Sequence, residues 1–207
     1  MSDHDRGARP TGPEAWDERH AAHEPIESHE PDPTLVREVA GLAPGRALDL
    51  ATGDGRNAIW LASQGWQVTG VDFSGVALGR ARTSAQSVGV AVDWLRTDLL
   101  DWTPPAGTFD LVCIFFLHLP LEERQEVYAR AAAAVRPGGT LLVVGHDATN
   151  LVDGVGGPQD PALLFTPAEI VAELSGFTIV RSDVIRRPTT DGHGPLDAVV
   201  RAVRDAR

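Results

Sequence analysis

The sequence predicts an α/β fold: a doubly wound, mostly parallel seven-stranded sheet with an antiparallel last strand. Three observations support this prediction. Short apolar segments alternate with helical patterns from about residue 33 onward, as in sheets whose parallel strands are joined by helices. A glycine-rich turn at 51–55 follows the first of these segments and precedes a helical pattern. Two strands close the chain, at 177–186 and 196–203, with no room between them for a crossover helix, so they should pair antiparallel.

Residues 1–32 precede this alternating pattern and are rich in Pro, Gly, His and acidic residues. A segment of this composition buries little apolar surface, so we expect a flexible leader. Its exception is 15–23, a short helix candidate that carries Trp16. The main domain is expected to cover residues 33–207.

Residues that commonly cap helices mark several helix starts. Asp32 precedes a proline, Ser74 precedes a long helical pattern, and Thr166 is followed by Pro167 and Glu169 in a capping-box arrangement. Helices are expected over 33–42, 56–64, 74–88, 121–135 and 166–176. The first five strands, joined by helices, are expected over 46–50, 67–71, 91–95, 110–116 and 140–145.

The composition restricts the class of protein. The 207 residues are 43% hydrophobic and 23% charged, which suits one water-soluble domain. A net charge of −11 argues against nucleic acid and anionic membranes as partners and favours a small-molecule substrate. No apolar run approaches the roughly 20 residues that cross a bilayer, and no signal-like segment is evident, so a cytoplasmic location is expected. We also expect a monomer or homodimer. The single cysteine, Cys113, excludes an internal disulfide and should be buried.

The turn at 51–55 carries the most information about function. The segment 47–58 reads ALDLATGDGRNA, so an expected buried strand runs into glycines at 53 and 55 and then into a helix. Glycine lets the backbone bend sharply and lets a ligand approach closely, and free N–H groups at the helix start favour an anion. Gly53–Ala58 also matches the GxGxxA pattern of dinucleotide-binding folds, and a tight strand–helix connection without a ligand has the same features. The turn alone therefore does not decide which ligand, if any, binds here.

Two carboxylates narrow the choice. Asp72 ends the second expected strand, where a carboxylate can accept both hydroxyls of a ribose. Asp98 follows the third, where it could meet the exocyclic amine of a base. Each residue alone is as well explained by a helix cap or a solvated turn. Together with Asp49, at three successive strand ends, they outline an adenosine site.

At this point the sequence resembles class I S-adenosylmethionine-dependent methyltransferases. The resemblance spans about 46–144 and rests on successive motifs at 49–55, 71–73, 97–99, 109–112 and 136–140. The segments 16–19 (WDER) and 53–57 (GDGRN) look like the branch that includes tellurite-resistance and thiopurine methyltransferases. Two positions depart from the usual pattern: Ala51 replaces the first glycine, and Thr52 stands where a small residue or cysteine is common.

The resemblance implies S-adenosylmethionine as the cofactor, with S-adenosylhomocysteine as the product, and assigns roles by position. Asp49 would face the methionine ammonium, Asp72 the ribose, and Asp98 with Leu99 the adenine edge. Trp16 and Arg19, on the leader helix, would close over the cofactor. The cofactor-binding residues implied in this way are Trp16, Arg19, Asp49, Ala51, Thr52, Gly53, Gly55, Asn57, Asp72, Phe73, Ser74, Asp98, Leu99 and Phe116.

Methyl transfer by direct displacement needs mainly an in-line geometry, and an alcohol or amine acceptor also needs a base. His146 and His118 are the candidate catalytic residues because each follows an expected strand. His193, in the turn before the last strand, is a third candidate. Polar loop histidines without a catalytic role have the same pattern. His20 and His23 share a helix face but have no evident third ligand, so no metal site is expected.

Two matters stay open at the level of sequence. The loop 151–158 is apolar and glycine-rich and could be a substrate lid or an inert connector. The acceptor could be a thiol, a chalcogen oxyanion or a small organic nucleophile. Two alternatives to the enzyme are a non-catalytic S-adenosylmethionine-binding sensor or accessory subunit, and an NAD-dependent oxidoreductase. Asp49 before the glycines, the Pro-Gly-Gly turn and the antiparallel end argue against the oxidoreductase.

Overall fold

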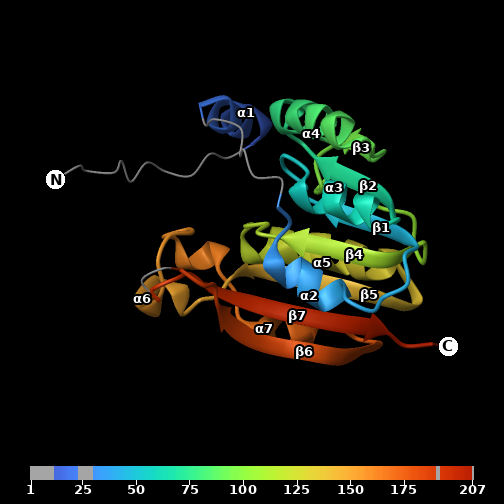
Figure 1. Cartoon of the computed structure of the whole chain (residues 1–207). Coiled ribbons are helices and arrows are strands. Elements are labelled where there is room, and N and C mark those ends of the chain that lie inside the picture. Colours follow the sequence, from blue (N-terminus) through green and yellow to red (C-terminus); the bar gives the residue numbers. More distant parts are fainter. Residues whose placement is uncertain (1–11, 23–29, 190–191, 207) are drawn as a thin grey trace.

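A computed structural model describes residues 12–22, 30–189 and 192–206 of the chain. The predicted sheet is confirmed: seven strands lie in the order β3-β2-β1-β4-β5-β7-β6 (Figure 1). The first five strands pair in parallel, and β7 is antiparallel to both of its neighbours. The strands are β1 (Arg46–Leu50), β2 (Gln67–Asp72), β3 (Asp93–Arg96), β4 (Phe109–Phe115), β5 (Val135–His146), β6 (Phe177–Arg186) and β7 (Leu196–Arg204).

Helices cover both faces of this sheet. On one face lie α2 (Pro33–Val39), α3 (Arg56–Ser63) and α4 (Gly75–Val88), and on the other α5 (Leu121–Ala134) and α7 (Pro167–Glu173). Consecutive β4 residues alternate between the two cores, with Val112 and Ile114 on the α5 side and Leu111 and Cys113 on the α2 side. The burial of Cys113 is thus confirmed, and burial raises the pKa of its thiol well above the usual value.

The predicted capping residues act as caps. Asp32 accepts a hydrogen bond from the Thr34 N–H at 2.8 Å, and Ser74 Oγ accepts one from the Ala77 N–H at 3.1 Å. Thr166 and Glu169 form the complete capping box at the start of α7. These local signals therefore place the helix starts, as expected of side chains that satisfy the first free N–H groups.

One connection in the parallel part of the sheet lacks a helix. The expected helix ranges include none between the third and fourth strands, and the described residues 97–108, between β3 and β4, contain none. This segment contains residues that oppose helix formation, Pro104, Pro105 and Gly107. The connection is therefore a loop. Predicted ends also shift: α2 stops at Val39 rather than 42, because Ala40 leaves the helical conformation and Gly41 has a φ of +84°.

The fifth strand is longer than predicted, because β5 begins before the Pro-Gly-Gly sequence instead of after it. Val135 already pairs with Phe109, and regular pairing resumes at Thr140 with Leu111. The Pro137-Gly138-Gly139 turn is therefore an irregular excursion within the strand, where Gly138 adopts a φ of +75°.

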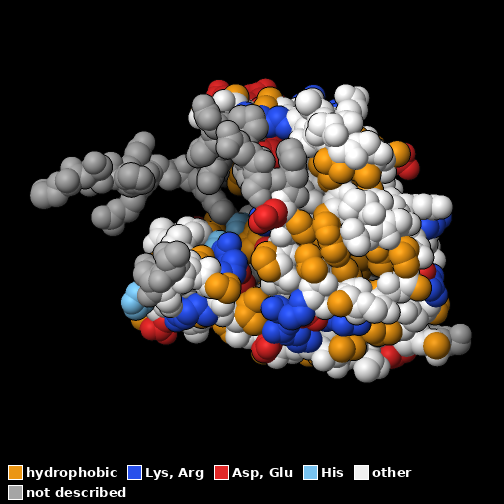
Figure 2. Space-filling model, in the orientation of Figure 1, with side chains coloured by type: hydrophobic (Ala, Val, Ile, Leu, Met, Phe, Trp, Pro, Cys, Tyr) orange, Lys and Arg blue, Asp and Glu red, His pale blue; other side chains and the backbone are white. Residues whose placement is uncertain are grey.

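Ion pairs tie α2 to the antiparallel end of the sheet. Glu38, 6% exposed, contacts Arg37 on its own helix, Arg181 on β6 and Arg201 on β7. Arg181 also pairs with Asp183. Basic side chains gather over β7 in Figure 2, beside the apolar surface of the α2 and α3 face.

The predicted leader helix is present as α1 (Pro13–Ala22), and it packs on α4 (Figure 1). Asp17 holds it there by accepting hydrogen bonds from the Ser74 hydroxyl and from the Val76 N–H at 3.2 Å. Arg96 lies 3.7 Å from the same carboxylate. The prediction of a flexible leader falls largely on residues 1–11 and 23–29, outside the described residues. No helix in the described ranges is long and apolar enough to cross a membrane.

Candidate cofactor and acceptor site

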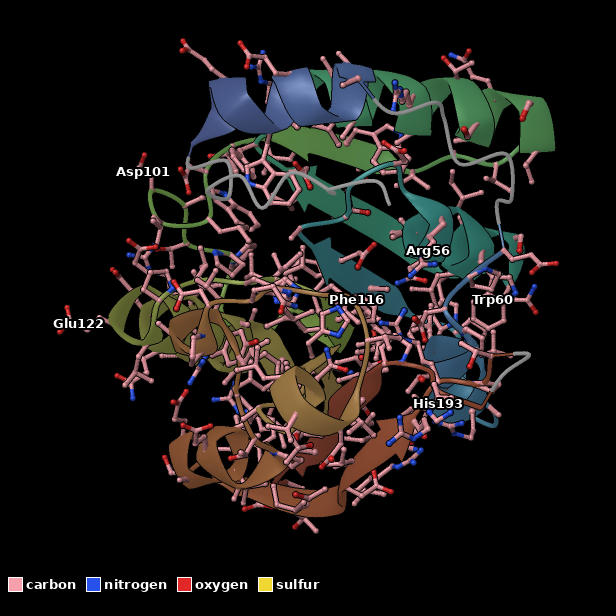
Figure 3. The ribbon with its side chains drawn as sticks, turned by 90° about the vertical axis from the view of Figure 1, so that its left-hand side faces the viewer. Arg56, Trp60, Asp101, Phe116, Glu122 and His193 are labelled. Atoms are coloured by element: carbon pink, nitrogen blue, oxygen red, sulfur yellow. The ribbon has the colours of Figure 1, made fainter. Side chains whose placement is uncertain are left out.

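A cavity of about 550 Å³ opens where the parallel strands end, in the size range of small-molecule sites. Figure 3 faces this edge of the sheet, with Phe116 near its centre. The cavity receives residues from α1, from the ends of β1 to β4, from α5 and from the segment before α7. Its lining consists of Gly12, Trp16, Ala51, Asp72, Phe73, Asp98, Leu99, Leu100, Leu117, His118, Leu119, Pro120, Glu123, Asp160 and Leu163.

Asp72 lines the cavity in a fixed orientation. Its two carboxylate oxygens accept hydrogen bonds from the Gly53 N–H at 2.8 Å and the Ser74 N–H at 2.9 Å. The residue is 5% exposed, and its neighbour Phe73 lines the same cavity. Such a carboxylate loses little side-chain entropy when it accepts hydroxyl hydrogen bonds from a ligand. Ser74 is itself fully buried and serves the α4 cap and Asp17.

Asp98 and Leu99 lie on the loop after β3 and also line the cavity. The Asp98 carboxylate accepts a hydrogen bond from the Leu100 N–H at 2.9 Å. Arg130, a residue that the sequence reasoning missed, supports this loop from α5. Its Nη1 donates to the carbonyls of Leu99, Leu100 and Trp102 at 3.1, 2.7 and 3.2 Å. The Arg130 guanidinium therefore fixes the position of this loop relative to α5. No local sequence pattern predicts this contact.

Asp49 lies behind the cavity rather than in its lining, 2% exposed on β1. Its carboxylate accepts a hydrogen bond from the Thr52 hydroxyl at 2.6 Å and another from the Ala58 N–H at the start of α3. The pKa of Asp49 is raised to about 7, mainly by burial; the hydrogen bond from Thr52 lowers it, and the nearby Asp72 contributes to raising it. A neighbouring cation would favour its ionised form.

The turn residues have three different reasons for their conformations. Ala51 lines the cavity with a φ of +56°, which explains why glycine would suit this position. Gly53 has the same φ and open space where a Cβ would stand, whereas a Cβ on Gly55 would lie 2.6 Å from the Trp94 ring. Gly55, with a φ of +80°, is therefore needed for packing of α3 on the sheet.

Asn57 and Trp16 make different kinds of contact. Asn57 is 4% exposed, and its side-chain oxygen accepts a hydrogen bond from the Asp32 N–H at 2.9 Å, which ties α3 to the start of α2. Trp16 lines the cavity from α1. The side chains of Arg19, His20 and His23 lie outside the described residues. In the described part of the chain, no group of three His, Cys, Asp or Glu side chains is arranged to hold a metal ion.

Phe116 directly follows β4 and precedes the lining residues Leu117 and His118, but it does not itself line the cavity. It has a φ of +54°, in the left-handed region that a residue of this size rarely adopts, and its N–H donates to the Val144 carbonyl at 2.8 Å. The Arg187 guanidinium lies 4.9 Å from the centre of its ring. Strained backbone of this kind concentrates at functional sites.

The two candidate histidines differ in access. His118 lines the cavity, whereas His146 lies behind it and is 7% exposed. Their rings stack with centroids 5.3 Å apart and an angle of 12° between the planes. His146 Nδ1 lies 3.2 Å from Asp197 on β7, and Arg187 Nε lies 2.6 Å from the other oxygen of that carboxylate. Sequence reasoning missed Asp197 and Arg187 because they follow in the chain long after the histidines.

The third candidate histidine and the 151–158 loop are placed away from the cavity lining. His193 is exposed and lies apart from Phe116 in Figure 3. The helix α6 (Asn150–Asp153) overlaps the start of this loop, and the loop is held to β7 because the Asn150 side chain donates to the Gly156 carbonyl and accepts from the Leu196 N–H. The segment after it, including a short 3-10 helix at Pro161–Leu163, supplies Asp160 and Leu163 to the cavity.

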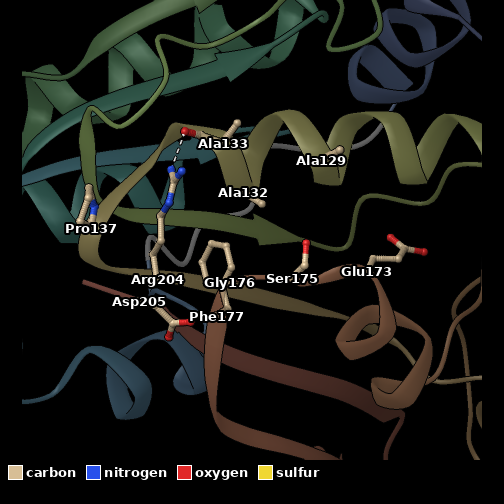
Figure 4. A pocket seen from close by; sticks show the side chains of 10 residues that line it. All are labelled: Ala129, Ala132, Ala133, Pro137, Glu173, Ser175, Gly176, Phe177, Arg204 and Asp205. Atoms are coloured by element: carbon tan, nitrogen blue, oxygen red, sulfur yellow. Dashed lines mark hydrogen bonds between the residues drawn. The ribbon is translucent and has the colours of Figure 1, made fainter. Parts of the chain in front are cut away.

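A second cavity, of about 400 Å³, lies between α5 and the start of β6 (Figure 4). Two of the three charged side chains that line it are engaged in the fold, whereas the buried Glu173 Oε2 has no hydrogen-bond partner among the described residues. Arg204 donates to the Ala133 and Val135 carbonyls at 3.0 and 2.6 Å, and Asp205 accepts from the Thr178 hydroxyl at 2.9 Å. The contacts of Arg204 satisfy backbone carbonyls at the carboxyl end of α5 and the start of β5, so they serve to stabilise the fold.

Comparison with known proteins matches the central part of the chain to methyltransferases. Residues 47–139 match the family model described as "Methyltransferase domain". Demethylmenaquinone methyltransferase from Thermus thermophilus is 36% identical over 104 residues, which are 49% of this chain and 47% of that protein. The chain spans about half the length of the curated relatives it matches.

Solved structures extend the likeness beyond the matched segment. One, from work described as "Conversion of a Disulfide Bond into a Thioacetal Group during Echinomycin Biosynthesis", is 25% identical with a TM-score of 0.72, over 93% of this chain and 92% of that one. TehB from Haemophilus influenzae is 16% identical with a TM-score of 0.68, over 93% and 67%, which shows the fold alone.

The chain therefore combines the fold of class I S-adenosylmethionine-dependent methyltransferases with their motifs, and the predicted resemblance to that class is confirmed. The branch within the class rests on the motifs at 16–19 and 53–57.

Proposed function

We propose that this protein transfers a methyl group from S-adenosylmethionine to a small-molecule acceptor. The observation that carries the proposal is that Asp72 and Asp98, from two neighbouring strand ends, line one cavity that continues to His118. A nucleoside needs hydrogen-bond acceptors for its ribose and its base together with apolar surfaces for the ring, and the first part of this cavity offers both.

The residues present fit this cofactor. Asp72 would accept the ribose hydroxyls, Phe73 and Leu99 would contact the adenine faces, and Asp98 would accept from its amine. Trp16 would cover the site from α1, and Arg19 would act beside it. Asp49, whose carboxylate accepts a hydrogen bond from the Thr52 hydroxyl, would attract the methionine ammonium directly or through water. Gly53, Gly55, Asn57 and Ser74 shape the surrounding turn, and Phe116 would lie beside the sulfonium.

When bound, S-adenosylmethionine supplies a methyl carbon activated by positive sulfur, which an acceptor can attack in line. His118 would take the proton that an alcohol or amine acceptor loses, because it faces the cavity between the cofactor part and the 119–123 segment. His146 would hold the His118 ring in place by stacking, with Asp197 fixing the His146 ring. A thiol acceptor would depend less on His118, since thiols ionise more readily.

The test has two parts. Calorimetry should detect binding of S-adenosylmethionine and S-adenosylhomocysteine, and a screen of thiols, phenols, amines and chalcogen oxyanions should yield S-adenosylhomocysteine with at least one acceptor. Binding of neither form would refute the proposal. Binding without transfer to any acceptor would favour the sensor, and binding of NAD instead would favour the oxidoreductase. A cytoplasmic location, a monomer or homodimer, and the absence of nucleic-acid or membrane partners stay predictions.

A further inference from the structure

The far side of the cavity, beyond the residues assigned to the cofactor, has a distinctive charge. It is formed by Leu117, Leu119, Pro120, Leu163, His118, Glu123 and Asp160. Among the described side chains that line the whole cavity there is no Lys or Arg, while four are carboxylates, namely Asp72, Asp98, Glu123 and Asp160. The first two belong to the nucleoside part, so Glu123 and Asp160 remain for the acceptor.

Two arginines close in sequence or contact to this region, Arg124 and Arg187, lie outside the lining. Arg124 is 2% exposed, donates to the Leu164 carbonyl at 3.1 Å and lies over the Phe165 ring at 5.2 Å. Arg187 pairs with Asp197 behind Phe116. Neither guanidinium belongs to the lining, so among the described side chains of the lining an anionic acceptor would meet carboxylates and no Lys or Arg.

The two carboxylates differ in how they are held. Asp160 Oδ1 accepts a hydrogen bond from the Ala162 N–H at 2.9 Å, which orients the side chain and leaves its second oxygen for a ligand. Glu123 is half-buried in the first turn of α5, one residue after Glu122, which is exposed and points away from the molecule in Figure 3. Both glutamates suit a helix N-terminus, but only Glu123 also lines the cavity.

We infer, on the basis of the proposed function, that the acceptor is a small cation: an apolar body bearing a protonated amine or similar group. Its positive group binds Glu123 and Asp160, its apolar body contacts the leucines and Pro120, and its separate nucleophilic atom reaches His118. This excludes chalcogen oxyanions and carboxylate-bearing molecules as preferred acceptors, because both would be repelled by the lining.

Matched acceptors of different charge test the inference. One series is tyramine, 4-ethylphenol and 3-(4-hydroxyphenyl)propionate, which share a phenol, and another is cysteamine, 1-propanethiol and 3-mercaptopropionate, which share a thiol. Binding to the protein loaded with S-adenosylhomocysteine is measured by calorimetry, and turnover by product formation. We expect at least one cationic member to bind about tenfold or more tightly than its anionic counterpart, and this ratio to fall with added salt.

Two variants separate recognition from folding. Glu123→Gln should lower the cation-to-anion ratio about three- to fivefold and leave the neutral member unchanged, whereas Glu122→Gln should leave the ratio as it is. The inference is overturned if anionic members bind as tightly as cationic ones, if no cationic member binds, or if both variants act alike. Loss of S-adenosylhomocysteine binding in the unmodified protein would instead refute the proposed function.

Discussion

The two sides of the cavity are assembled in different ways. The cofactor side draws on short segments at or just after the ends of strands, at 51–57, 72–74 and 98–99, and those strands are neighbours in the sheet. The acceptor side combines the loop after β4 with residues from 160–163 and support from β7. A local pattern can therefore encode the first side, whereas the second depends on contacts between segments far apart in the chain.

The largest test of this comparison removes the base proposed for the acceptor side. His118→Asn should lower kcat for a phenol or amine acceptor by about 10²-fold or more, as loss of a general base does. Affinity for S-adenosylhomocysteine should not change, because His118 contacts the acceptor and not the nucleoside. His193→Asn is the control, since His193 is exposed in its turn. Equal rates in the His118 variant and the original protein would remove this residue from the mechanism.

The matching test on the cofactor side replaces Asp72 with alanine. Loss of two charge-assisted hydrogen bonds to ribose, each worth about 1.5–3 kcal/mol, should weaken cofactor binding on the order of 10²-fold or more. Calorimetry measures it, with Asp101→Ala as the control because that side chain is exposed and points outward in Figure 3. Because Asp72 also accepts from two backbone N–H groups, thermal unfolding of the variant is measured alongside, to show that the weaker binding does not come from unfolding. Unchanged affinity in a folded variant would contradict the placement of the ribose.

A smaller effect concerns the pH dependence of cofactor binding. The pKa of Asp49 is raised by burial to about 7, so its carboxylate is largely protonated at pH 6 and ionised at pH 8. Since only the ionised form attracts an ammonium group, affinity for S-adenosylmethionine should be about tenfold lower at pH 6 than at pH 8. Calorimetry at both pH values measures this, and Asp49→Asn should abolish the difference. An equal pH dependence in that variant would assign it to another group.

The smallest expected effect concerns the backbone at the end of β1. Ala51 has a φ of +56°, so Ala51→Gly should relieve strain and raise the free energy of unfolding by about 0.5–1 kcal/mol, after the greater freedom of glycine in the unfolded chain is counted. Denaturant unfolding measures the change. A lower stability than that of the original protein would show that the alanine methyl group contributes more by packing than it costs by strain.

The elements show how far sequence alone reaches in the fold. Alternating apolar segments, the caps at Asp32, Ser74 and Thr166, and the short space before β7 predicted the sheet, its direction and most helices correctly. The segment between β3 and β4, for which no helix range was predicted, stays a loop because its prolines and glycine oppose a helix. Local signals succeed where one side chain satisfies a nearby backbone group.

What the sequence determined by itself is the chemistry available at successive strand ends, because parallel strands bring their carboxyl ends to one edge whatever the details of packing. Only the tertiary structure decided that His118 lines the cavity while His146 packs behind it against Asp197, that Arg130 supports the loop of Asp98, and that Glu123 rather than Glu122 lines the cavity. These contacts depend on the angle and depth at which α5, β7 and the 160–163 segment meet, and no spacing along the chain specifies that geometry.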